Sequence, residues 1–293
     1  EAELTGLKEI MRAFSLNSQV QDLMAQAFLD AKTAPERQRA VIEVIRDSDL
    51  PKFPAKWMNP VRRALVSTNA TMREFAFGII ESRNLLGFDD HLHNMAELDA
   101  RDDLRYRAYA VIARQDTLTD LQIEALVEDA KATDTRKRAG AVSALSQAGL
   151  SDKILIQLAR EVLPQADAIT LAPLLAPFRG RDSDAVGQAL VGTLLKNPAL
   201  WEITNPRIIE QILLSYSPAV KSSGAALLRN LVTTHQDKIK QLTDLAPLLR
   251  HGSVTSGRRI FFSQKSQCST CHAVGNEGGE FGPDLTAIGK IRS

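Results

Sequence analysis

The sequence predicts an all-α protein in which a long array of helices precedes a short segment of different character. Ala and Leu recur throughout while aromatic residues make up only 5% of the chain, and this composition favours helices over a β-sandwich or barrel. Apolar residues follow helical spacing up to about Leu249, after which glycines become frequent and the chain's two cysteines occur. We therefore expect two domains, residues 1–250 and 251–293.

The first helices of the array are marked by apolar stripes with spacing i, i+3, i+4 and i+7. These stripes lie at Leu4–Phe14, Val20–Phe28 and Ala40–Ile45. Further helix starts are marked by a capping residue close before a proline, and these prolines are Pro35, Pro206 and Pro218. No part of the array alternates with a period of two, so we expect no strand there.

The helices recur in pairs with a period in the low thirties. One phrase returns four times: a polar or acidic start, then basic residues, then a small residue that opens an apolar stripe. The small residues are Ala40, Ala76, Ala108 and Ala139. Between residues 139 and 189 the phrase is interrupted, and Pro164, Pro173 and Pro177 predict short or kinked helices there. Such a period indicates a solenoid.

This pattern resembles HEAT repeats over roughly residues 30 to 250, with an aspartate before the second helix, an arginine shortly after it and small residues where helices meet. We expect a HEAT-like α-solenoid, a right-handed superhelix of about six or seven antiparallel helix pairs. The resemblance implies a scaffold whose concave surface binds a protein partner and which carries no chemistry of its own.

The polar residues of the array have a structural interpretation. Acidic residues flank almost all of the basic clusters, so we expect solvated faces or repeat-to-repeat ion pairs rather than an anion site. These clusters are Arg62–Arg63, Arg105 with Arg107, and Arg136–Arg138. His91 and His93 lack further ligands at zinc spacing, and a surface loop is the preferred interpretation. No nucleophile with a base and no phosphate loop occurs, so no catalytic residue is expected in this segment.

Charge and hydropathy bear on the possible partners. The 36 basic and 35 acidic side chains leave a net charge of +1, which creates no field to attract nucleic acid or an anionic membrane. No apolar run approaches the roughly 20 residues that span a bilayer. The chain starts at Glu1 with no signal-peptide pattern, and we expect that an upstream segment has been removed.

The two cysteines form the sequence Cys268-Ser-Thr-Cys271-His272, the attachment sequence for c-type haem. Residues three apart on a helical turn face one side, so both thiols can form thioethers with the two vinyl groups of one porphyrin. His272 is then aimed at the iron as its proximal ligand. Two alternatives are a redox dithiol, which normally follows a strand in a βαβ unit, and half of a zinc site, which needs a second pair.

The residues around this motif resemble a class I cytochrome c. Gly257 and Phe261 look like its first helix, although Phe261 lies three residues further from the first cysteine than usual. Residues 282–285 resemble the Gly-Pro-x-Leu segment that follows the haem histidine, and the resemblance implies that the carbonyl of Pro283 accepts the Nδ1–H of His272.

The whole combination resembles the haem-binding proteins of Planctomycetes and Verrucomicrobia. The matching residues are Gly257, Phe261, Cys268, Cys271, His272, Gly279, Gly282, Pro283, Asp284, Leu285, Thr286, Ile288 and Gly289. The resemblance implies covalent haem c, periplasmic or other extracytoplasmic electron transfer, and a redox partner protein or dehydrogenase domain. The rival interpretation is a non-catalytic interaction scaffold with a structural or redox-labile cysteine pair.

A class I cytochrome usually takes its second iron ligand from a methionine tens of residues beyond the histidine. The 21 residues after His272 contain no Met, so we expect the chain to stop inside its cytochrome domain. The sixth position would then be open, filled by water or taken by a histidine such as His251. Produced in a reducing cytoplasm without attachment enzymes, the chain is expected to carry no haem.

Overall fold

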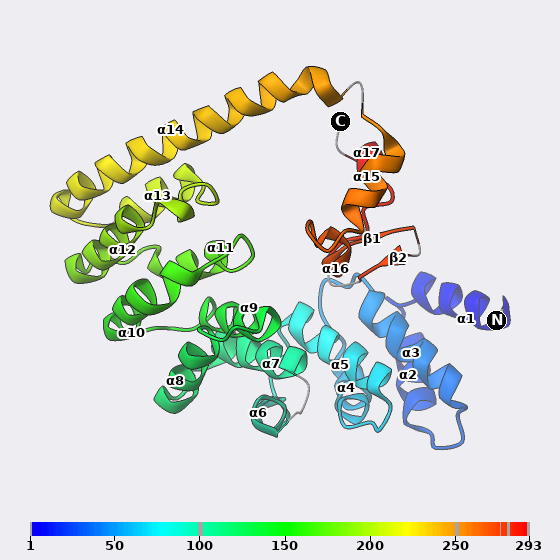
Figure 1. Ribbon diagram of the computed structural model, residues 1–293. Helices are drawn as coiled ribbons and strands as arrows, with labels where there is room; N and C mark the ends of the chain where they lie inside the picture. Colours follow the sequence, from blue (N-terminus) through cyan, green and yellow to red (C-terminus); the bar gives the residue numbers. More distant parts are fainter. Residues whose placement is uncertain (1, 99–101, 250–251, 276, 280–281, 292–293) are drawn as a thin grey trace. The chain divides into compact units, whose positions relative to one another are not determined.

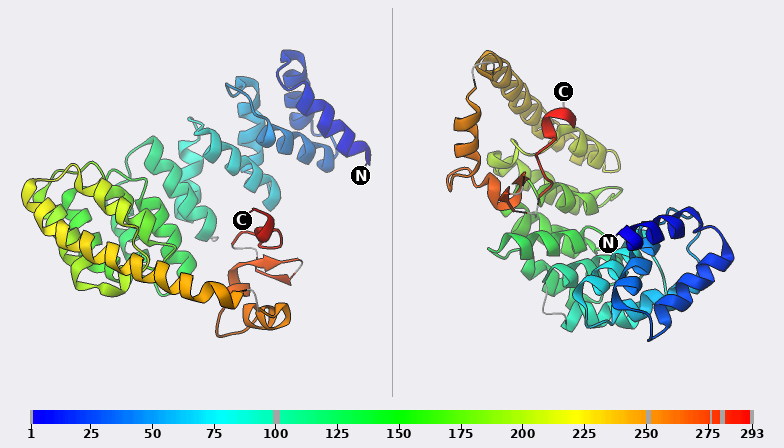
Figure 2. Two further views of the ribbon diagram at one scale, coloured as in Figure 1. Left: turned by 90° about the horizontal axis from the view of Figure 1, so that it is seen from above. Right: turned by 90° about the vertical axis from the view of Figure 1, so that its right-hand side faces the viewer.

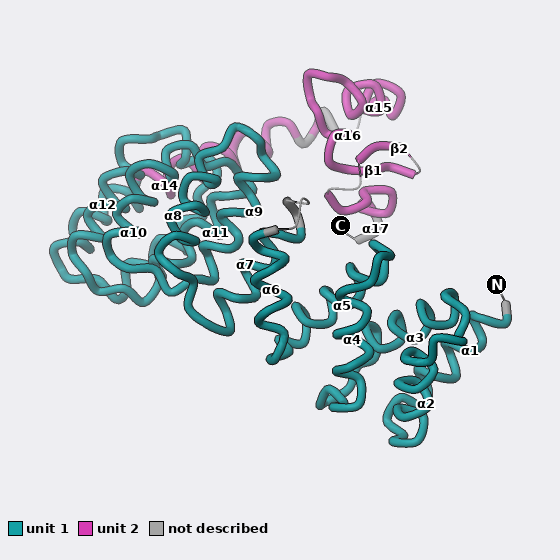
Figure 3. The backbone as a smooth tube through the Cα atoms, turned by 90° about the horizontal axis from the view of Figure 1, so that it is seen from below, with its two compact units in different colours: residues 1–229 teal, residues 230–293 magenta. Residues whose placement is uncertain are grey.

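The computed structural model describes residues 2–98, 102–249, 252–275, 277–279 and 282–291, and their regular secondary structure is helical apart from one short hairpin. The predicted all-α class is therefore confirmed. The chain divides into two compact units, Glu1–Arg229 and Asn230–Ser293 (Figures 1 and 3). This division falls inside a helix, whereas the change in composition that suggested a boundary lies at residues 250 and 251, outside the described residues.

The first half of the first unit consists of regular helices. They are α1 (Ala2–Ala13), α2 (Ser18–Leu29), α3 (Pro35–Asp47), η1 (Ala55–Trp57), α4 (Met58–Leu65), α5 (Ala70–Arg83), α6 (Asp89–Leu98), α7 (Asp102–Gln115), α8 (Asp120–Asp129) and α9 (Thr135–Leu145). Side-chain caps start several of them, because an Asn or Asp oxygen accepts backbone N–H groups that the first turn leaves unpaired. Asn17, Asn69 and Asp134 cap α2, α5 and α9 in this way.

Shorter pieces follow between residues 152 and 213. They are α10 (Asp152–Gln157), the π-helical turn η2 (Leu158–Val162), η3 (Leu163–Gln165), α11 (Leu171–Leu175), η4 (Ala176–Phe178), α12 (Asp184–Lys196), η5 (Pro198–Leu200) and α13 (Pro206–Leu213). Pro164, Pro173 and Pro177 lie within these short helices, as the sequence predicted. Each proline removes a backbone donor, so an uninterrupted α-helix is unfavourable here.

Helices of the first unit contact the next helix or the next but one along the chain, as in α1 with α3, α3 with α5, and α7 with α9. Polar ties repeat at similar separations: Lys8 pairs with Glu43, and Arg138 with Asp167. The partners are 35 and 29 residues apart. The core is apolar, with Trp57 among its fully buried side chains. Each helix pair thus buries its apolar face against a sequence neighbour.

Two of the three basic clusters make ion pairs, as the sequence predicted, whereas Arg62 and Arg63 donate to backbone carbonyls. Arg107 on α7 donates to Glu74 at 2.5 Å and to Glu81 at 2.6 Å, both on α5. Burial alone would lower the pKa of Arg107, but these two carboxylates outweigh it and raise the pKa. Arg105 and Lys137 both approach Asp129. These side chains join α7 to α5, and α7 and α9 to α8.

The prediction of a surface loop around His91 and His93 is wrong, because both residues lie on α6. Leu92 and Ala96 are four residues apart and both buried, so burial of one helical face stabilises the helix. Nδ1 of His93 lies 2.9 Å from the carbonyl oxygen of Asp89, one turn earlier.

The second unit begins within α14 (Pro218–Leu249), one long helix visible in Figures 1 and 2. It continues with α15 (Val254–Phe261), α16 (Cys268–Cys271), β1 (Ala273–Val274), β2 (Glu277–Gly278) and α17 (Ile288–Ile291). The two strands pair antiparallel, with Ala273 opposite Gly278. They were not predicted, since two residues cannot display an alternating pattern. None of the described helices combines the length and apolar character needed to cross a membrane.

Candidate functional site

The two cysteines stand at the ends of one helical turn. Gln267 precedes the turn in a left-handed conformation, with φ 52°, and the amide of His272 closes it by donating to the carbonyl of Cys268 at 3.0 Å. His272 then leaves the helix with extended backbone, φ −110°. Both thiols are free; Cys268 is exposed and Cys271 is half-buried. The turn therefore offers two thiols and an imidazole within five residues.

The imidazole of His272 is held by the backbone of a later loop. Nδ1 lies 2.9 Å from the carbonyl oxygen of Pro283. Because a carbonyl oxygen only accepts hydrogen bonds, we assign the ring proton to Nδ1. Nε2 then keeps its lone pair, and none of the described residues donates a hydrogen bond to it. A neutral imidazole with a fixed Nδ1–H is the form that binds a metal through Nε2.

Gly282 lies directly against this ring. A Cβ atom at Gly282 would come within 2.6 Å of Nδ1 and Cε1 of His272, so only glycine fits without a shift. Its amide donates to the carbonyl of Cys271, and the amide of Gly279 donates to Ser269 at 2.8 Å. Glycine at both positions thus lets the later loop pack against the backbone of the cysteine turn.

A second set of hydrogen bonds fixes the loop that carries Pro283. The carboxylate of Asp284 accepts from the amide of Thr286 at 2.7 Å and from its hydroxyl at 2.5 Å. Both hydrogen bonds lower the pKa of Asp284, and the one from the hydroxyl has the larger effect. The hydroxyl oxygen of Thr286 accepts from the amide of Gly275 at 2.5 Å. The loop is thus tied to the residue that follows β1.

Sequence reasoning identified Asp284 and Thr286 only as members of a motif and did not predict these hydrogen bonds. A signal for it exists, because Asp-x-Thr is a local pattern in which the aspartate accepts from the backbone two residues on. The partner amide at Gly275 lies eleven positions away. Local patterns do not specify a contact of that kind.

The helix α15 and the hairpin are joined at the surface. Arg258 pairs with Glu277 on β2 and lies 4.9 Å from the ring of Phe262, which contacts Phe261 edge-on at 5.0 Å. At Gly257 no heavy atom of a described residue lies within 4 Å of where its Cβ would be, so no other described segment packs closely against α15 there. The region is held by polar contacts and by one aromatic pair.

No described residue from 252 onward is buried. Ile260 is 60% exposed and Val254 89%, while Phe261 and Phe262 are half-buried. A segment with fixed backbone and exposed apolar side chains has no core of its own. A large apolar group bound to the two thiols would supply such a core.

The donor set fits a covalently attached haem. Within the part of the chain that the structure describes, no three His, Cys, Asp or Glu side chains gather to hold a metal ion. Haem attachment does not need them to gather, because the two sulfurs bond to the porphyrin and only the imidazole binds iron. His251, the alternative ligand considered above, lies outside the described residues. The chain matches no protein family, no curated protein and no solved structure.

Proposed function

We propose that the protein transfers electrons through a covalently attached c-type haem, with the helical array as the scaffold that binds its partner. The observation that carries this proposal is the contact between His272 and Pro283, which leaves Nε2 as the available nitrogen beside two free thiols. The haem, when bound, supplies one-electron oxidation and reduction at iron.

Each residue of the chain has a separate task. Cys268 and Cys271 hold the porphyrin through thioethers, which prevents its loss. His272 offers Nε2 to the iron, and Pro283 fixes the tautomer and strengthens the imidazole as a donor. Gly282 allows the loop to approach the ring closely enough for this bond.

The scaffold part of the proposal is a HEAT-like solenoid. Side-chain hydrogen bonds at separations of 29 to 38 residues support it, because a repeat period in the low thirties would place such partners in neighbouring repeats. In this proposal the array binds a redox partner protein or belongs to a larger dehydrogenase. Because thioether haem is attached after export, the site of action is extracytoplasmic.

The experiment is export of the chain into a periplasm that contains haem-attachment enzymes. The purified protein is extracted with acid and acetone, and its absorption spectrum is recorded. We expect a Soret band that survives extraction in the unaltered chain and in the control Ser269→Ala, which changes a residue between the cysteines. Cys268→Ala with Cys271→Ala should abolish the band. An unaltered chain without a band would favour the interaction scaffold instead.

A further inference from the structure

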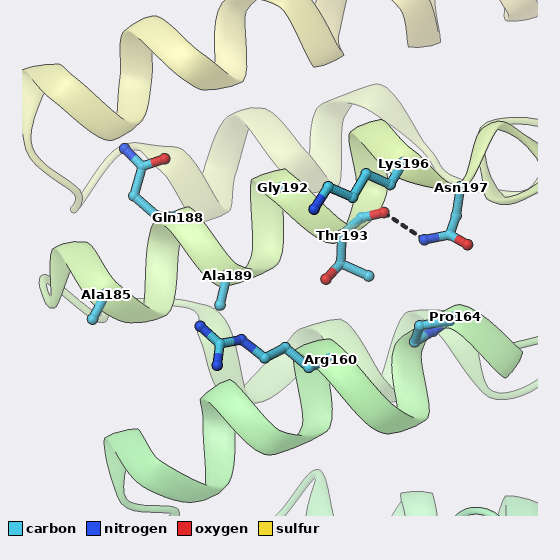
Figure 4. Close-up of a pocket in the computed structure, with 9 residues that line it drawn as sticks. All are labelled: Arg160, Pro164, Ala185, Gln188, Ala189, Gly192, Thr193, Lys196 and Asn197. Carbon is cyan, nitrogen blue, oxygen red and sulfur yellow. Dashed lines mark hydrogen bonds between the residues drawn. The ribbon is translucent and has the colours of Figure 1, made fainter.

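A groove on the first unit lies between α12 and the segment formed by η2 and η3 (Figure 4). Its volume is about 550 Å³, within the range of binding sites in proteins. The last residue that lines the groove, Asn197, is 71 positions before Cys268, and the proposed haem chemistry does not use the groove. Nothing described so far accounts for it.

The floor of the groove is open because small residues share one face of α12. Ala185, Ala189 and Gly192 follow one another at spacings of four and three, so they lie on the same side of the helix. A Cβ atom added at Gly192 would meet no heavy atom within 4 Å. On the opposite side, η2 is a π-helical turn that ends at the proline-containing η3, and such turns often accompany functional sites.

Two positive charges face this groove. Arg160 extends from η2 toward Ala189, and Lys196 lies at the far end of α12 (Figure 4). No carboxylate lines the groove, and neither cation makes a hydrogen bond or ion pair with a described residue. Arg107 and Arg138, by contrast, are paired with carboxylates of the neighbouring repeat. The groove therefore carries an uncompensated charge in a chain whose net charge is only +1.

The shape indicates an extended ligand. The lining residues run along α12 from Ala185 to Lys196, a rise of about 17 Å at 1.5 Å per residue. About five residues of extended peptide cover that length. Asn197 donates its side-chain amide to the carbonyl of Thr193 at 2.7 Å, which leaves its Oδ1 to accept a peptide N–H. Gln188 has a second amide on the same lining.

We infer that this groove binds an acidic peptide segment of a partner protein, with carboxylates paired to Arg160 and Lys196. Carboxylate oxygens suit a guanidinium and an ammonium placed on opposite sides of one groove. The inference specifies the scaffold part of the proposed function. It stands or falls independently of the haem, because no residue of the cysteine turn takes part.

The test is fluorescence anisotropy of a labelled hexaglutamate peptide with the full chain at low ionic strength. Arg160→Gln with Lys196→Gln should weaken binding about tenfold, as expected for the loss of two exposed ion pairs. The matched control is Lys153→Gln with Arg207→Gln, which removes the same charge from exposed positions outside the groove. This control should change binding less than about twofold.

A second variant blocks the groove without changing charge. Gly192→Leu should weaken binding about fivefold or more, because the added side chain occupies the floor beside Lys196. Gly78→Leu, on a helix position with equally open space, is its control. Equal effects of the two charge variants, or unaltered binding by Gly192→Leu, would overturn the inference. The inference would also be overturned if inorganic phosphate displaced hexaglutamate and diglutamate bound as tightly as hexaglutamate. Together these results would mark a site for small anions.

Discussion

The Nδ1 atom of His272 and the carbonyl oxygen of Pro283 lie 2.9 Å apart, although eleven positions of the chain separate the two residues. The loop between them contains the hairpin β1–β2 and returns to the cysteine turn through Gly279 and Gly282. The direction of the imidazole is therefore set by backbone groups, which cannot rotate away as a side-chain partner could.

Replacing Gly282 by alanine should disturb the His272–Pro283 contact. The new Cβ would lie 2.6 Å from the ring, so the ring or the loop must move. In the chain without haem, we expect nitrogen NMR of the imidazole to change from mainly the Nδ1-protonated tautomer to a mixture. Gly289→Ala is the control, because its added Cβ meets nothing within 4 Å. An unchanged tautomer in Gly282→Ala would contradict the assigned contact.

The hydrogen bonds that Asp284 accepts from Thr286 should weaken in acid. Hydrogen bonds from Thr286 lower the pKa of Asp284 below its ordinary 3.8, so the folded loop favours the ionised form. The stabilisation is complete above pH 3.8 and is lost as the pH falls through the lowered pKa. Hydrogen exchange at the amides of Gly275 and Thr286, corrected for intrinsic rates, should show protection that declines in this range. In Asp284→Asn the protection should not depend on pH there.

The ion pairs of Arg107 should stabilise the array. Arg107→Ala removes the ion pairs with Glu74 and Glu81. It also removes the contact of the guanidinium with the ring of Phe77, whose centre is 4.8 Å away. All three charged side chains are about a third exposed, so solvent screening limits the loss to about 1–2 kcal/mol. Urea unfolding followed by circular dichroism measures it. Arg136→Ala, at an exposed position, should cost less than about 0.5 kcal/mol.

Two glycines on helices should respond oppositely to alanine. At Gly140 the new Cβ would collide with the ring of Tyr106, whose Cγ atom lies 2.7 Å away, and such overpacking costs about 1–3 kcal/mol. At Gly78 the space is open, and alanine should stabilise the helix by about 0.5–1 kcal/mol. Thermal unfolding of the two variants makes the comparison. A stabilised Gly140→Ala would show that α7 and α9 do not pack as described.

The all-α class and the helix starts at Pro35, Pro206 and Pro218 could be predicted because they depend on local signals. Asn205 caps α13 before Pro206, and Asp134 caps α9, each within three residues of its partners. The helix at His91 was missed because polar residues outnumber the buried Leu92 and Ala96, so its stability depends on tertiary packing.

Only part of the candidate site could be predicted from the sequence. The spacing of Cys268, Cys271 and His272 is visible in the sequence, since thioether attachment needs two thiols on one turn. The hairpin and the bond from Gly275 to Thr286 were not, because they depend on how the loop returns through space. A contact across eleven positions has no periodicity that a sequence pattern displays.

The most direct test of the account is the mass of one tryptic peptide. Cleavage after Lys265 and Lys290 releases residues 266–290, which contain both cysteines and His272 and no other lysine or arginine. Isolated from the chain exported with attachment enzymes, this peptide should be heavier by one haem and should not react with thiol-alkylating reagents. A peptide at its unmodified mass with two alkylatable thiols, or lighter by two hydrogens as a disulfide, would contradict the assignment of haem to Cys268 and Cys271.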